Sequence, residues 1–135
     1  MTYKELKDRI RDLGFEEEST MNEYSSIILG ACNRAISTVY HTVLSRAEGY
    51  FKFKYIDWDM PKMDVLTAST EDEYELNLPD KVVFLVPLLA SYYIWLDDDE
   101  RKAVMYRNEY DELKDQILTE ALTATRCKVV GGFNV

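Results

Sequence analysis

The most apolar stretch of the chain, residues 82–96, is the feature around which the rest of the hydrophobic pattern is arranged. Only Pro87 and Ser91 in this stretch lie outside the apolar and aromatic set. A helix without a polar face is normally buried on all sides or spans a membrane, and a span needs about 18 or more apolar residues. Because this run is shorter and acidic residues follow it, the pattern predicts a core helix that begins at Pro79 and bends near Pro87.

A long amphipathic helix is predicted after the acidic run at residues 97–100. Asp98 or Asp99 is expected to cap it, because the first turn of a helix favours carboxylates. A Mg²⁺ or Ca²⁺ site is the alternative use of these acids, but calcium loops alternate their ligands around a glycine and this run has none. The two helices should therefore fold back on each other across an acidic turn. Apolar residues recur at helical spacing along the second one, at Ala103, Tyr106, Tyr110, Leu113, Ile117 and Ala121.

Two further helices are predicted in the N-terminal third of the chain. Thr2 followed by Glu5 matches a capping box, and the helix that it begins should end at Gly14. A second capping box at Thr20 should begin a helix that runs to about residue 45 or 46. Cys32 lies on the broad apolar stripe of this helix, so we interpret it as a buried structural thiol.

Residues 50–78 change from helical to alternating periodicity. Phe51, Phe53 and Tyr55 alternate with lysines. In a second run, Tyr74, Leu76 and Leu78 alternate with Glu73, Glu75 and Asn77. Period-two alternation predicts two strands, whose antiparallel pairing would set lysines against glutamates. We therefore expect a β-hairpin over about residues 50–78.

The connection between these two strands, residues 56–72, is long for a hairpin and contains Trp58, Met60 and Met63. Long connections in compact domains are usually functional or disordered. The side chains could form a binding loop, or they could cover the open end of the helical core, and the sequence leaves both interpretations open.

The C-terminal segment, about residues 124–135, is short and apolar, contains two glycines and shows no helical pattern. Because free tails are more often polar, we expect an extended tail that docks on a neighbouring subunit, for example as an added strand. A frayed terminus is the alternative. The candidate interface therefore combines residues of the hairpin region with residues of the tail: Phe51, Phe53, Tyr55, Trp58, Met60, Met63, Val129, Val130, Phe133 and Val135.

These elements predict a mainly α protein with one domain over residues 1–135. Its architecture would be a bundle of about four helices, with the β-hairpin inserted between the second and third helices and an extended C-terminal tail. The formal net charge is −9, which argues against tight wrapping of duplex DNA because that affinity comes from Lys and Arg. Ten tyrosines against five phenylalanines favour an interaction role, since tyrosine is enriched at interfaces.

The residues that carry catalytic chemistry do not form a recognisable arrangement. His41 is the only histidine, and no serine, cysteine or carboxylate partner lies at a known triad spacing from it. Cys32 and Cys127 are far apart and indicate a reducing compartment, and no secretory signal sequence is evident. We therefore expect no catalytic site, no bound metal and no cofactor, and synthesis in the cytoplasm.

Residues 78–118, under a third of the chain, resemble the head–tail connector proteins of long-tailed phages, also called adaptor or head-completion proteins. The resemblance is a matter of pattern and size, and the family has no catalytic signature. The aromatic density of the expected hairpin has no counterpart that we can match to the family. The residues that carry the resemblance are Leu78-Pro79, Leu88-Leu89-Ala90, Tyr93, Trp95, Asp97-Asp98, Ala103, Tyr106, Glu109-Tyr110 and Leu113.

The resemblance implies a structural virion protein at the head–tail junction. Such proteins form a homo-oligomeric ring, commonly of about twelve copies related by closed rotational symmetry. The ring would bind the phage portal protein, offer a platform to a tail or head-closure protein, and extend a channel through which DNA passes without sequence-specific contact. The alternative function is an acidic helical regulatory module that mimics DNA or binds a partner protein. Neither function requires a membrane.

Overall fold

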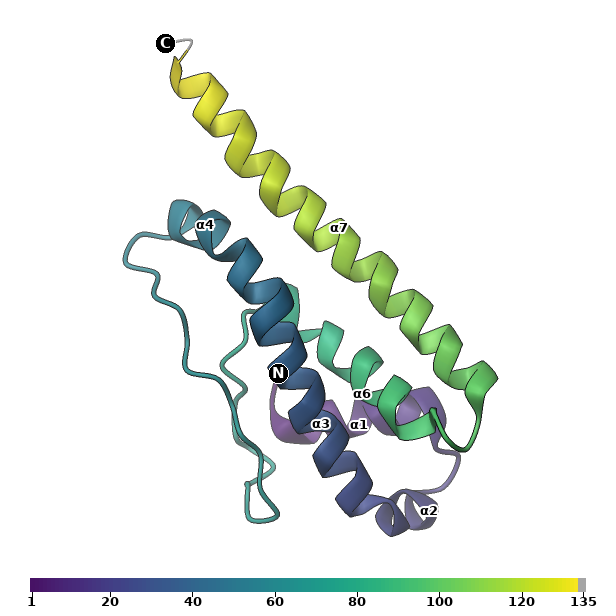
Figure 1. Ribbon diagram of the computed structural model, residues 1–135. Helices are drawn as coiled ribbons and strands as arrows, with labels where there is room; N and C mark the ends of the chain where they lie inside the picture. The colour runs from purple at the N-terminus through teal and green to yellow at the C-terminus, as the bar shows by residue number, and fades with distance from the viewer. Residues whose placement is uncertain (134–135) are drawn as a thin grey trace.

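The computed structural model describes the backbone of residues 1–133 and the side chains of residues 1–124, and it is mainly helical (Figure 1). Its centre is α6 (Leu85–Trp95), which packs against α7 (Glu100–Phe133), α3 (Ser25–Val39) and α1 (Tyr3–Gly14). α6 and α7 fold back on each other across the acidic turn, as the hydrophobic pattern predicts. The mainly α class is therefore confirmed, and α6 is the buried helix around which the others are arranged.

The apolar stretch is divided into α5 (Asp80–Val83) and α6, with Phe84 between them. Pro79 is the N-cap residue of α5, so the helix begins at Asp80, one position after the expected start. Pro87 explains the break, because it cannot donate to the carbonyl of Val83 and its ring displaces that carbonyl. The bend expected near Pro87 thus falls three residues before the proline itself.

The acidic turn caps α7 as expected. The Oδ1 atom of Asp99 accepts a hydrogen bond from the backbone N–H of Lys102 at 3.2 Å. The side chains at helical spacing that were expected to face the core are buried, apart from Leu113, which is partly buried and packs against the core. The buried members are Ala103, Tyr106, Tyr110, Ile117 and Ala121.

The prediction of an extended tail is wrong for residues 124–133, because α7 continues through them to Phe133. The helix comprises 34 residues and is therefore about 51 Å long. Extending an existing helix adds one hydrogen bond for each residue that is fixed, and Thr or Val lowers helix propensity by less than about 1 kcal/mol per residue. Each of the two glycines that suggested an extended tail lowers helix propensity by about 1 kcal/mol, which weakens the last turns of the helix without ending it.

Two short N-terminal helices precede the long α3. In α1, the Thr2 Oγ1 atom accepts from the backbone N–H of Glu5 at 3.1 Å, which confirms the first predicted cap. α2 (Glu18–Glu23) begins before Thr20 and is separated from α3 by a break at Tyr24. The hydroxyl of Tyr106 on α7 donates to the backbone carbonyl of Leu13, which ties the end of α1 to the long helix.

The predicted β-hairpin is wrong, and no strand occurs in residues 1–133. The helix that was expected to end near residues 45–46 continues beyond them. α3 is followed without interruption by a π-helical turn, η1 (Tyr40–Leu44), and then by α4 (Ser45–Lys54). Five alternating residues also fit a helix, because Phe51 and Tyr55 are four residues apart and their rings stack with centroids 6.4 Å apart. Glycine in a helix costs about 1 kcal/mol relative to alanine, which the packing of α4 on α7 and of Phe51 in the core offsets at Gly49.

Residues 55–79, which we call the strap, contain no regular element and run back along α3 to the N-terminal end of α1 (Figure 1). The side chain of Asn33 on α3 holds the strap through two hydrogen bonds with the backbone N–H and carbonyl of Leu66, both 2.8 Å long. At the end of the strap, the backbone N–H of Leu76 donates to the carbonyl of Met1 at 2.9 Å, and an isolated antiparallel bridge joins Thr2 to Glu75. Leu66 and Leu76 are buried, so the strap covers the helical core.

Candidate interaction surfaces

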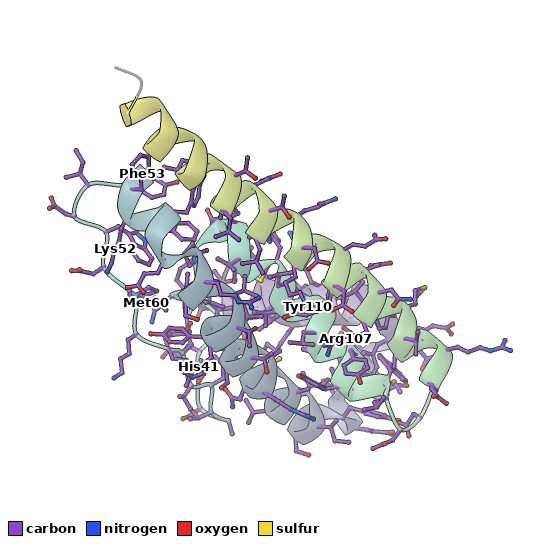
Figure 2. All side chains as sticks on the ribbon, turned by 45° about the horizontal axis from the view of Figure 1, so that its top comes forward. His41, Lys52, Phe53, Met60, Arg107 and Tyr110 are labelled. Carbon is purple, nitrogen blue, oxygen red and sulfur yellow. The ribbon has the colours of Figure 1, made fainter. Side chains whose placement is uncertain are left out.

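The aromatic residues at the end of α4 divide into a buried and an exposed set. Phe51 is 3% exposed, and its ring stacks on Trp58 of the strap with a centroid distance of 5.4 Å. Phe53 and Tyr55 are 45% and 47% exposed. Figure 2 places Phe53 at the far end of the α3–η1–α4 rod, beyond His41. Phe51, a predicted interface residue, is therefore a core residue, whereas Phe53 and Tyr55 keep nearly half of their surface exposed.

Trp58, Met60 and Met63 of the strap are partly buried and pack against the hydrophobic core. Of the two interpretations of this segment, covering the core therefore describes these three side chains better than an exposed binding loop. Sequence reasoning missed Ile56, which is 94% exposed and lies directly beside Tyr55. The signal that could have indicated this exposed residue is the pair Tyr55-Ile56, in which the aliphatic side chain follows an aromatic one and fits no periodic pattern.

The tail candidates lie at or beyond the limit of the described residues. The backbone of Val129, Val130 and Phe133 belongs to the last turns of α7, and their side chains are outside the described set. Val135 lies wholly outside the described residues. Leu122, just before this segment, is 60% exposed.

An open hollow at the end of α4 brings lysines together with aromatic rings. The Lys54 ammonium lies 5.5 Å from the centroid of Tyr50, and the Lys81 ammonium lies 5.0 Å from the same ring. A hydrogen bond with Tyr50 raises the pKa of Lys54 above its usual value, so this lysine carries a full charge at neutral pH. Lys81 also pairs with Glu120 on α7 at 3.0 Å. The hollow therefore offers charge and ring surface for contact with another molecule.

The residues with catalytic or metal-binding potential are also separated in space. His41 lies in η1, is exposed, and meets the ring of Tyr40 edge-on at 5.2 Å. Cys32 is fully buried, and burial raises the pKa of its thiol to about 12, so it is a structural thiol as predicted. Among the side chains of residues 1–124, no group of three or more His, Cys, Asp or Glu residues could hold a metal ion.

A buried carboxylate anchors the strap. Asp64 is 4% exposed, and it accepts hydrogen bonds from the hydroxyl of Tyr74 and, at 2.9 Å, from the backbone N–H of Asn77. The hydrogen bond to Asp64 raises the pKa of Tyr74 to about 12. The protonated phenol is therefore the form that stabilises the fold.

This contact predicts a specific loss of stability in alkali. The pKa of Tyr74 is higher in the folded protein than in the unfolded chain. The hydrogen bond of its phenol therefore contributes fully to the free energy of unfolding below about pH 10, and this contribution is lost as the pH rises through about 12. Tyr74→Phe should lower the free energy of unfolding by about 1–3 kcal/mol at pH 7, and the variant and wild-type values should converge by pH 12. Urea unfolding measured from pH 7 to 12 in reducing buffer tests this, with Tyr92→Phe as the control. A constant difference across that range would contradict the assignment.

Comparison with protein-family models, with curated proteins and with solved structures finds no match for this chain. Within the part of the chain that the structure describes, no helix is both long enough and apolar enough to cross a bilayer. The fold and its surfaces thus define a helical protein with exposed apolar and charged contact surfaces, and its function is a matter for a proposal.

Proposed function

We propose that this protein is a structural virion assembly subunit that forms a ring between the portal and the tail of a long-tailed phage. The ring would extend the DNA channel and help to retain the packaged genome. The observation that carries the proposal is that the residues with the family resemblance, 78–118, contain the short α5, the central α6 and the part of α7 that folds back on α6. This helix pair is the centre of the fold, so the resemblance concerns the part of the chain that determines its shape.

The physical features of the subunit suit such a role. The rod formed by α3, η1 and α4 and the long α7 give the subunit stiff elements that can pack side by side in a ring. Phe53, Tyr55 and Ile56 leave apolar surface at one end of the molecule, where a portal or tail protein could bury it. The net charge of −9 would reduce adhesion of DNA to the channel wall if acidic residues line it.

Electron microscopy of the purified protein mixed with its portal protein tests this function. We expect rings stacked on the portal, and we expect the triple variant Phe53→Ala, Tyr55→Ala and Ile56→Ala to bind the portal more weakly by about tenfold or more. Replacement of Val65, which is 69% exposed at another part of the strap, serves as the matched control. A subunit that ignores the portal at high concentration would contradict the proposal. Salt-sensitive binding to a basic host protein would instead favour the regulatory alternative.

A further inference from the structure

The part of the α3–η1–α4 rod that precedes Glu48 lacks the acidic residues that are frequent elsewhere in the protein. The chain contains 25 Asp and Glu residues, yet residues 24–47 contain none. The charged residues in this segment are Arg34 and Arg46, and both are exposed. A protein of net charge −9 therefore carries one helical surface of opposite character.

Helix geometry brings the exposed residues of this segment onto one side. Ile27, Arg34 and His41 are spaced by seven residues, which is close to two helical turns. The π turn of η1 adds one residue to the rod, so Arg46 follows Arg34 by about eleven α-helical steps, or three turns. Ile27 is 51% exposed, and the Arg34 guanidinium lies 4.1 Å from the ring centroid of Tyr93. We call Ile27, Arg34, His41 and Arg46 the basic face.

A surface of complementary character lies on the exposed side of α7. Val104 and Met105 are 46% and 50% exposed, and Glu109, Glu112 and Asp115 follow them along the helix as exposed acids. Arg107 and Lys114 do not neutralise these acids, because both pair with Asp111, at 3.4 and 3.5 Å. Within residues 1–124, none of these three acids forms an ion pair, and neither do Arg34 and Arg46. We call Val104, Met105, Glu109, Glu112 and Asp115 the acidic face.

The two faces cannot meet within one subunit. Tyr110 is buried in the hydrophobic core and α7 packs against α4, so this side of α7 is directed at the core and the rod. Glu112 is two residues further along α7, which corresponds to a rotation of about 200° around the helix axis. The acidic face is therefore turned away from the core and the rod, and a partner for it must come from another molecule.

The order of residues along the helices favours a second copy as that partner. The α3–η1–α4 rod and α7 run side by side in the same general direction in both views (Figures 1 and 2). Each face begins with apolar residues and continues with charged ones: Ile27 to Arg34 spans about 10 Å, and Val104 to Glu112 spans about 12 Å. A rod placed parallel to α7 of another copy would therefore set Ile27 against Val104 and Arg34 against Glu112.

We propose that the basic face of one subunit binds the acidic face of α7 of the next subunit. The inference rests on the proposed ring function and specifies its lateral contact. Because the two faces differ, the contact is head-to-tail, and such contacts generate a closed ring when the rotation between copies closes. Rotation about an axis roughly parallel to the helices would keep the rod of one copy parallel to α7 of its neighbour. Opposite charges would fix the register, and the exposed aliphatic groups would supply the buried apolar area.

A charge-swap experiment tests this contact without the portal. Variant one carries Arg34→Glu and Arg46→Glu, and variant two carries Glu112→Lys and Asp115→Lys. Each variant alone opposes like charges across the contact, so its self-association should weaken by about tenfold or more relative to wild type at low salt. A 1:1 mixture restores opposite charges at every contact and should associate again. Analytical ultracentrifugation and native mass spectrometry measure both effects, and circular dichroism checks that each variant is folded.

Matched controls carry the same charge changes at exposed positions outside both faces: Lys4→Glu with Lys62→Glu, and Glu16→Lys with Glu71→Lys. These variants should associate like wild type. A wild-type protein that stays monomeric at high concentration and low salt, or a mixture that does not restore association, would overturn the inference. So would binding of DNA to the basic face of a protein that does not associate.

The same variants separate this inference from the ring function. If the mixture restores association but neither it nor the wild-type protein binds the portal, the contact between copies stands and the connector function is wrong. If wild-type rings form on the portal and both charge variants form them equally well, the connector function stands and the lateral contact is wrong.

Discussion

Phe51→Ala is expected to lower the free energy of unfolding by about 3–5 kcal/mol, the usual range for removing a buried phenylalanine ring. Phe51 is 3% exposed, stacks on Trp58, and belongs to the hydrophobic core under the end of α4. Its removal leaves a cavity between the helix and the strap that neighbouring side chains fill only in part. Urea unfolding followed by circular dichroism measures the change.

Phe53→Ala is the matched control, because the same ring is removed two residues further along the same helix. Phe53 is 45% exposed, so its truncation should cost about 1 kcal/mol or less. In a strand, residues 51 and 53 would share one face and their truncations would have similar effects, whereas a helix separates them by about 200°. Equal losses in the two variants would therefore contradict the helical assignment of α4.

Leu89→Ala should destabilise the protein by about 2–5 kcal/mol through the loss of buried apolar area and the cavity left behind. Leu89 is fully buried on α6, the helix that packs against α1, α3 and α7. Because helices approach α6 from several sides, no single movement can close the cavity. The loss should therefore lie in the upper part of this range, as measured by equilibrium unfolding.

Leu96→Ala provides the comparison for this prediction, since it removes the same atoms at the C-terminal end of α6. Leu96 is 39% exposed and directly precedes the acidic turn, so the expected loss is about 1 kcal/mol or less. A loss at Leu96 as large as that at Leu89 would show that α6 is not the core of the fold.

Sequence reasoning succeeded where one helix carries its own signals. The core face of α7 follows from the recurrence of Ala103, Tyr106 and Tyr110 at helical spacing, and its start follows from the short carboxylate side chain of Asp99. The cap of α1 at Thr2 is a contact between residues three positions apart. Such signals involve near neighbours, so the local sequence contains both partners of each interaction.

The exposed and buried members of the predicted interface could not be separated in this way. The burial of Phe51 depends on Trp58 in the strap, and the strap is held by Asn33, 33 residues away from its partner Leu66. No periodic pattern in the sequence indicates that the side chain of Asn33 hydrogen-bonds with the backbone of the strap. The alternation of residues 74, 76 and 78 identified Leu76 and Leu78 correctly as inward-facing but not Tyr74, which is 39% exposed. Leu76 and Leu78 cover the helical core and do not pair with a second strand.

The sequence by itself determined the helical class, the burial of most of residues 82–96, the acidic turn and the inward face of α7, because periodicity and capping are local properties of the chain. Phe84 and Leu96 are the exceptions in that stretch, at 42% and 39% exposed. Only the tertiary structure decided that residues 50–54 are helical, that α7 continues to Phe133, and that the strap closes over the core. The physical reason is that short alternating runs are compatible with both strand and helix. Long-range contacts between α4, α7 and the strap select between the two conformations.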